Sequence, residues 1–152
     1  MKKILLILII LISITHISAQ NNFPDSWIGH YQGNLEIYAV DSIAMNVKME
    51  LEIRKTAKDS VYSWVITYHL KNKMDIRTYS LKVVDTQKGM FKIDENNSIV
   101  IDAHLRHNTF TSFFEVQNNV IIATYTKEED IIIFEIISAK FKPVSGYRWQ
   151  NG

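Results

Sequence analysis

Residues 44–54, Ala-Met-Asn-Val-Lys-Met-Glu-Leu-Glu-Ile-Arg, alternate between apolar and polar side chains almost without interruption. Successive side chains of a β-strand point to opposite faces, whereas the period of about 3.6 residues in a helix would spread the apolar ones around its circumference. The alternation therefore predicts a β-strand with one buried face and one face in solvent. The buried face is expected to consist of Met45, Val47, Met49, Leu51 and Ile53.

Eight further segments are rich in the β-branched and aromatic residues that favour strands, and short polar turns separate them. They are residues 27–40, 61–70, 75–85, 90–94, 98–105, 109–116, 120–126 and 131–138. Between two of them, Asn118 and Asn119 predict a two-residue hairpin turn, because asparagine tolerates positive φ. We find no stretch with convincing helical periodicity. The pattern predicts an all-β chain, a single antiparallel meander of about nine strands.

An open meander would leave two unpaired strand edges, and small all-β proteins commonly remove such edges by closing into a barrel. We therefore expect one barrel domain over residues 20–152, in which residues 27–40 pair with residues 131–138. A β-sandwich is the structural alternative, because short strands separated by regular turns also build sandwiches.

The first 19 residues have the layout of a secretory signal peptide. Lys2 and Lys3 precede an unbroken apolar run over residues 4–12, and Ala19 offers a small residue at the expected cleavage site. The apolar run is about half as long as a membrane-spanning helix requires. We expect cleavage before Gln20 and no transmembrane segment in the mature chain.

Charge and cysteine content restrict the partners and the compartment further. Without residues 1–19 the chain has 15 basic and 16 acidic side chains, a net charge of −1. This balance provides no basic surface for nucleic acid or anionic lipid. The chain has no cysteine, so it can form neither a disulfide nor the thiol-linked anchor of a lipoprotein. We expect a soluble exported protein, periplasmic or extracellular.

Motifs for catalysis or metal binding do not stand out. His104 and His107 form His-x-x-His, but residues three apart in a strand face opposite sides. His30 and His69 fall on the polar faces of their strands, and the acidic clusters at residues 94–97 and 128–130 fit turns. The chain has no Gly-x-Ser-x-Gly and no cysteine nucleophile. We expect no catalytic residue, no metal site and no cofactor, which argues against an enzyme.

The start of the first expected strand, Asp25-Ser26-Trp27-Ile28-Gly29-His30-Tyr31-Gln32-Gly33-Asn34-Leu35, resembles the calycin superfamily of lipocalins and fatty-acid-binding proteins. The resemblance implies a small barrel in which Trp27 plugs the closed end. Gly29 and Gly33 would then let the strand bend. Asp25 stands where lipocalins have glycine, and residues 41–43 leave no room for the two-helix lid of fatty-acid-binding proteins. The resemblance therefore concerns the barrel rather than either branch.

The more apolar face of each strand is assigned to the interior, and this places Arg77 and Tyr79 inside. None of the neighbours assigned to the interior is acidic, so Arg77 needs another partner. Arg-x-Tyr puts a guanidinium and a phenol on one strand face, where they can share a carboxylate. Alternatively, Arg77 reaches solvent at the strand end or stacks on Trp27. An apolar pocket for a ligand is expected from Trp64, Tyr68, Phe110, Phe114 and Phe134.

Two functions follow from this interior. The first is a carrier or sensor that holds a small amphipathic or anionic hydrophobic ligand in the barrel. The second is a protein-interaction module, for example an inhibitor of an envelope hydrolase, that acts through its surface. A cavity on the order of several hundred Å³ would favour the ligand, and a filled interior would favour the surface.

Overall fold

The computed structural model describes residues 22–39 and 42–140, so the predicted signal peptide lies outside the described residues. A short 3-10 helix, η1 (Asp25–Trp27), precedes nine strands. The strands are β1 (Gly29–Tyr38), β2 (Ile43–Lys55), β3 (Val61–Leu70), β4 (Lys73–Asp85), β5 (Met90–Asp94), β6 (Val100–Arg106), β7 (Thr109–Val116), β8 (Asn119–Glu128) and β9 (Ile131–Lys140). Every predicted strand is present, with ends within two residues of the expected ones. The first strand begins two residues later than predicted, because Trp27 belongs to η1.

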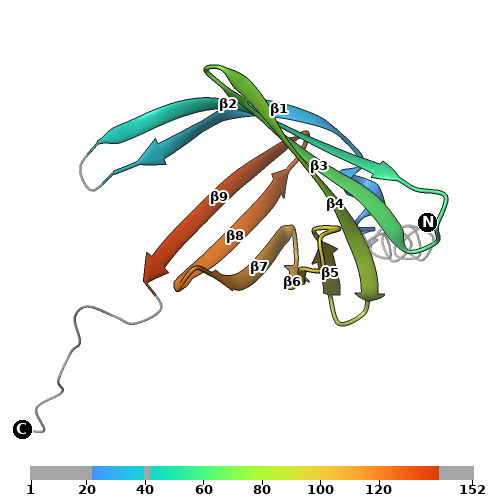
Figure 1. Ribbon diagram of the computed structural model, residues 1–152. Helices are drawn as coiled ribbons and strands as arrows, with labels where there is room; N and C mark the ends of the chain where they lie inside the picture. The colour runs from blue at the N-terminus through green and yellow to red at the C-terminus, as the bar shows by residue number, and fades with distance from the viewer. Residues whose placement is uncertain (1–21, 40–41, 141–152) are drawn as a thin grey trace, which may run out of the picture.

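Each strand pairs antiparallel with the next one along the chain, in the order β1 to β9. The sheet curls into a nearly closed barrel, which confirms the predicted meander and excludes the sandwich (Figure 1). Among the described residues, no helix has the length and hydropathy needed to cross a membrane.

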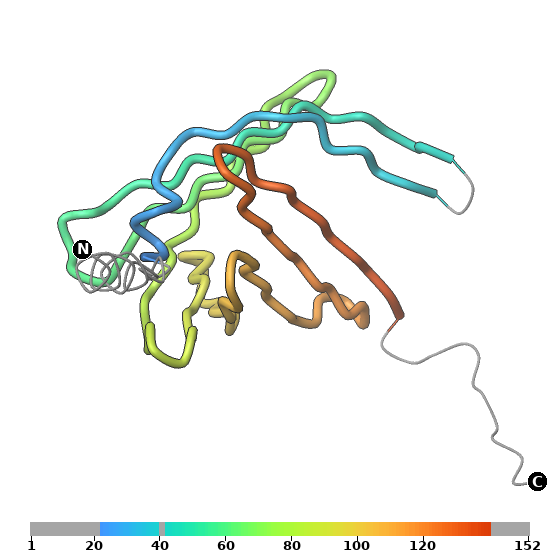
Figure 2. Tube along the Cα trace, turned by 180° about the vertical axis from the view of Figure 1, so that it is seen from behind, coloured from blue at the N-terminus to red at the C-terminus, as the bar shows by residue number. Residues whose placement is uncertain are grey.

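The expected pairing of residues 27–40 with residues 131–138 is wrong. In the described part of the chain no backbone ladder joins β9 to β1. Figures 1 and 2 show the turn between β8 and β9 beside β1, and from there β9 diverges towards Lys140. Pairing requires strands about 4.8 Å apart, whereas neighbouring strands rotate by about 20–25° and the rotation accumulates around the sheet. The two terminal strands therefore meet at an angle, and an open seam remains between them.

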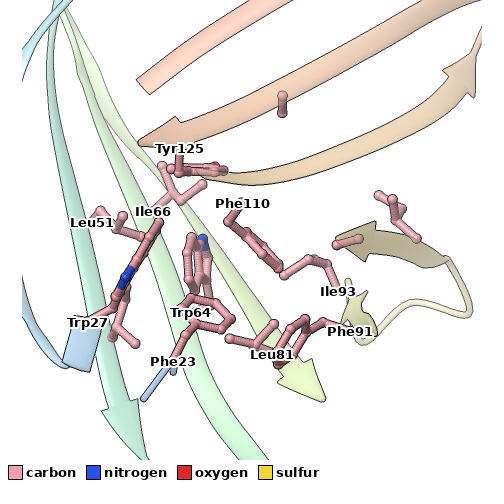
Figure 3. Packing of buried hydrophobic residues seen from close by; sticks show 14 of the residues in the cluster. Phe23, Trp27, Leu51, Trp64, Ile66, Leu81, Phe91, Ile93, Phe110 and Tyr125 are labelled. Carbon is pink, nitrogen blue, oxygen red and sulfur yellow. The ribbon is translucent and has the colours of Figure 1, made fainter. Parts of the chain in front are cut away.

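The hydrophobic core fills the end of the barrel next to η1. Trp27, Trp64 and Phe110 are almost completely buried there, and the ring centres of Trp64 and Phe110 lie 5.5 Å apart. Phe23, which precedes the predicted strands, packs on Trp27 at 4.9 Å and on Phe91 at 4.9 Å. Figure 3 shows these rings gathered between the strands. This half of the interior is filled by side chains.

The predicted buried face of β2 is confirmed at Val47, Met49, Leu51 and Ile53. The prediction is wrong for Met45, which is 50% exposed, because it pairs with Ile37 near the end of the hairpin at which β1 leads into β2. Three other apolar residues on the faces assigned to the interior are also exposed: Ile99 and Val116 near strand ends, and Ile136 within β9. Period two thus predicts the direction of a side chain but not whether the barrel covers it.

The turn between β7 and β8 is one residue earlier than predicted. Val116 pairs with Asn119, so the two turn residues are Gln117 and Asn118. Their φ values of 50° and 61° are those of a primed turn, which keeps the twist of the flanking strands.

Candidate functional site

A cavity of about 260 Å³ lies in the seam between β1 and the first residues of β9. Its lining consists of His30, Tyr31, Gln32, Gly33, Asn34, Leu35, Met49, Leu51, Asp130, Ile131, Ile132 and Phe134. The core fills the end of the barrel next to η1, whereas the cavity lies where β1 and β9 do not pair. Of the seven ligand-pocket residues that the sequence suggested, Phe134 alone lines it.

The floor of the cavity is apolar and its rim is polar. Leu35, Met49, Leu51, Ile132 and Phe134 point from the inner faces of β1, β2 and β9. The rim carries the carboxylate of Asp130 and the backbone edge of residues 30–35, whereas the side chains of His30, Gln32 and Asn34 alternate with the inward ones and point to the outer face of the sheet. Such a division into an apolar floor and a few polar groups is typical of binding sites for small molecules.

Gly33 opens the cavity from the middle of β1. It faces Met49 across the β1–β2 ladder, and a Cβ atom built on it would meet no other atom within 4 Å. Any other residue at this position would extend a side chain into free space. From the sequence, Gly33 is expected to help the strand bend; what the structure shows is free space beside its backbone.

A polar contact crosses the seam at one end of the cavity. Lys127 Nζ of β8 donates to the phenol oxygen of Tyr31 at 3.3 Å and lies 5.2 Å from the centre of that ring. Tyr31 in turn donates its hydroxyl to the carbonyl of Trp27 at 3.0 Å. This chain of contacts ties β8 to β1 and to η1 where no backbone ladder does so.

Glu50 joins three strands on the outer face of the sheet. Its two carboxylate oxygens lie 2.9 Å from Nε2 of His30 on β1 and 2.7 Å from Nε2 of His69 on β3. A carboxylate only accepts hydrogen bonds, so both imidazoles donate. The hydrogen bonds from His30 and then from His69 lower the pKa of Glu50 below its ordinary value. One carboxylate thus bridges three strands.

Replacing Glu50 with glutamine tests this bridge through its pH dependence. A lowered pKa stabilises the fold above the pKa of the unfolded carboxyl, and the contribution is lost as the pH falls through the folded value. We therefore expect the variant to be less stable than the wild type near pH 7, and the difference to be smaller near pH 3. Urea unfolding at both pH values measures it. The exposed Glu115→Gln serves as control, and a difference unchanged at acid pH would contradict the bridge.

The inward face of β4 carries a charged pair, where an arginine without an acidic neighbour is expected from the sequence. The side chain of Arg77 is 53% exposed, and its Nη2 and Nε lie 3.2 and 3.3 Å from Oδ2 of Asp75. The expectation that Arg77 has no acidic neighbour is therefore wrong. Asp75 shares its strand face because the two residues are two apart, so Asp-x-Arg was the missed signal. The guanidinium also lies 5.6 Å from the ring centre of Tyr68, not on Trp27.

Aromatic side chains connect the cavity with the filled core. Phe134 stacks on Tyr125 at 4.7 Å, and Tyr125 contacts Trp64 at 5.1 Å. Burial raises the pKa values of Tyr125, Tyr68 and Tyr79, and the hydrogen bonds that Arg77 donates to Tyr79 and to Asp75 raise the pKa of Arg77. Trp64 and Phe110 belong to the filled core, and Phe114 is half-buried beside it. Because their pKa values are raised, the phenols of Tyr68, Tyr79 and Tyr125 are neutral at physiological pH.

A second, larger hollow lies beside the turns that follow β4 and β6. It has a volume of about 1110 Å³, and Lys88, His104, Arg106 and His107 are among its lining residues. Arg106 donates to the carbonyl oxygens of Lys88 and Leu105, so its guanidinium is already engaged. Within residues 22–39 and 42–140, no group of three histidine or acidic side chains is placed to hold a metal ion.

No protein-family model, no curated protein and no solved structure matches the chain. The nine-strand, all-antiparallel, nearly closed barrel fits a calycin-like fold in general terms. A barrel of this kind supports many functions, so function has to follow from the site.

Proposed function

We propose that the protein binds a small amphipathic molecule in the cavity between β1 and β9. The supporting observation is an apolar floor beneath a polar rim at an opening of the barrel. Ligand pockets usually have volumes of about 300–1000 Å³, so this cavity lies close to the lower limit. The ligand is accordingly small, or only its apolar part enters. We retain export through residues 1–19 and a calycin relationship as parts of this proposal.

The second part of the proposal is an anionic head group held by Arg77 and Tyr79. Phe134 of the cavity lining and Tyr68, whose ring centre lies 5.6 Å from the guanidinium, both pack against the hydrophobic core. Arg77 has five N–H donors, and Asp75 engages two of its nitrogens. A ligand carboxylate would share the guanidinium with Asp75 or displace it. The aspartate reduces the attraction for an anion, so the apolar part supplies most of the affinity.

A protein-interaction module remains the second candidate, and a row of apolar side chains on the outer face supports it. Phe113 pairs with Ile122 and Ile122 with Ile137, which places the three side chains side by side across β7, β8 and β9. Phe113 is 63% and Ile137 62% exposed. Exposed apolar groups of this kind often mark contact surfaces.

Replacing Gly33 with leucine is expected to block the cavity. The new side chain enters free space without a clash, so the fold should keep its stability while the ligand loses its place. A fluorescent medium-chain carboxylate is titrated into wild type and variant, and we expect the affinity to fall at least about tenfold, or about 1.4 kcal/mol. Gly33→Ala, which adds a single carbon, serves as the matched control.

The same titration separates the parts of the proposal. Arg77→Ala should weaken binding of the carboxylate by about 1.5–3 kcal/mol and leave the matching alkyl alcohol unaffected. Equal binding of the carboxylate by wild type and Arg77→Ala would refute the head-group site only. If the wild type binds neither probe, the cavity is not a ligand site and the surface candidate takes its place.

A further inference from the structure

The seam cavity touches the backbone edge of β1 as well as its inner face. A cavity inside a closed barrel is lined by every second residue of a strand, because the others point outwards. Here six consecutive residues of β1, 30–35, line the cavity. In an antiparallel strand every second residue turns its N–H and C=O away from the paired neighbour. β1 has no ladder on the side opposite β2 within the described residues.

These free backbone groups can pair with a further strand, and Gly33 leaves space for one. A glycine inside a strand often marks the place where another backbone approaches closely. Gly33 has open space where its Cβ would be, and the apolar side chains of Met49 and Leu51 lie on the adjacent β2. A strand laid along β1 would direct alternate side chains towards this floor.

The charge at one end of the cavity restricts the incoming strand. Glu128 at the end of β8 and Glu129 and Asp130 in the turn to β9 are all exposed, and Asp130 lines the cavity. In the described ranges these three carboxylates take part in no ion pair, whereas Lys127 contacts Tyr31. A basic side chain would therefore find complementary charge at this end of the cavity.

We propose that the seam binds an extended peptide segment of a partner protein, which adds as a strand along β1. The backbone of the segment pairs with the edge of residues 30–35, an apolar side chain enters the floor, and a flanking lysine or arginine faces the acidic turn. This is recognition by β-strand addition, in which the main chain provides affinity and alternate side chains provide specificity. The inference rests on the proposed function, in that the same cavity takes a ligand, and names a peptide as its class.

Fluorescence anisotropy of three labelled peptides, titrated with the whole protein, tests the proposal. The first peptide is Lys-Val-Leu-Val-Lys, the second is the same peptide N-methylated at alternate amides, and the third is Glu-Val-Leu-Val-Glu. We expect the first to bind and the second to bind at least about tenfold more weakly, because N-methylation removes the donors that pair with β1. The third should bind more weakly than the first, and more so at low salt.

A charge-reversed variant tests the acidic turn. Asp130→Lys should reverse the preference, so that the glutamate peptide binds better than the lysine peptide. Asp59→Lys, an exposed residue in the turn between β2 and β3, is the control and should keep the wild-type preference. Both variants must show the melting temperature of the wild type. A preference that shifts equally in both variants would reflect net charge and would contradict the assigned end of the cavity.

The outcomes distinguish this inference from the proposed function. If the alkyl probes bind and no peptide does, the peptide inference is refuted and the small-molecule site stands. If the N-methylated peptide binds as well as its parent, main-chain pairing is refuted. If the lysine peptide binds the wild type but not Gly33→Leu, and the alkyl probes do not bind, the ligand of the cavity is a peptide. Binding of neither probe class refutes both.

Discussion

Replacing Trp64 with alanine is expected to lower the free energy of unfolding by about 3–5 kcal/mol. Trp64 is 1% exposed and lies at the centre of the filled core, 5.5 Å from the ring of Phe110 and 5.1 Å from that of Tyr125. The smaller side chain would leave a cavity that a sheet held by ladders on both sides cannot collapse to fill. Because domains of this size are stable by about 5–15 kcal/mol, the loss is a large part of the total.

Urea unfolding followed by far-UV circular dichroism measures this loss. Phe113→Ala is the matched control, because it also removes a large aromatic side chain but from a position that is 63% exposed. We expect the control to change stability by less than about 1 kcal/mol. Similar midpoints for the two variants would show that the aromatic cluster around Trp64 does not hold the barrel together.

The second large effect is expected from Gly89→Ala in the turn that joins β4 to β5. Gly89 has a φ of 64°, and a Cβ atom built on it would lie 2.3 Å from the carbonyl oxygen of Leu105. The carbonyl of Gly89 accepts a hydrogen bond from the amide of Leu105 at 2.9 Å, and the amide of Gly89 donates one to the carbonyl of Thr86 at 3.2 Å. Positive φ costs a non-glycine residue about 1–2 kcal/mol, and the clash with backbone adds to it. We expect a total loss of about 2–4 kcal/mol.

Gly33→Ala provides the comparison for this variant. Gly33 has open space around its Cβ position and no positive φ, so the same substitution should change stability by less than about 0.5 kcal/mol. Thermal or urea unfolding of the two variants under identical conditions gives the difference directly. Equal stability of Gly89→Ala and the wild type would mean that the β4–β5 turn relaxes without cost.

The sequence predicts the elements of the candidate site but not their arrangement. His30 and His69 were correctly placed on the polar faces of their strands, yet no local pattern indicated that Glu50 holds both. That contact depends on the register of β1, β2 and β3, in which His30 lies opposite Glu52 and His69 opposite Lys48. Asp75, in contrast, could have been found from the sequence, because it shares a strand face with Arg77 by simple alternation.

The cavity could not have been predicted, because it comes from a pairing that does not form. Trp64 and Phe110 were expected to line a pocket, and they fill the core instead, because η1 and Phe23 pack against the same end of the barrel. Gly33 was read as a bend, and only the position of β9 shows that it opens a space at a free edge. The residues of a strand do not indicate whether a strand distant in the sequence will pair with it.

By itself, the sequence determined the nine strands, their order and the face that each turns inwards. These properties depend on alternation over a few residues and on turn residues such as Asn118, so local chemistry decides them. The tertiary structure alone decided that the barrel stays open between β1 and β9, and therefore where a ligand can enter. That outcome depends on a small twist between neighbouring strands, which accumulates over eight ladders before β9 meets β1 at an angle instead of side by side.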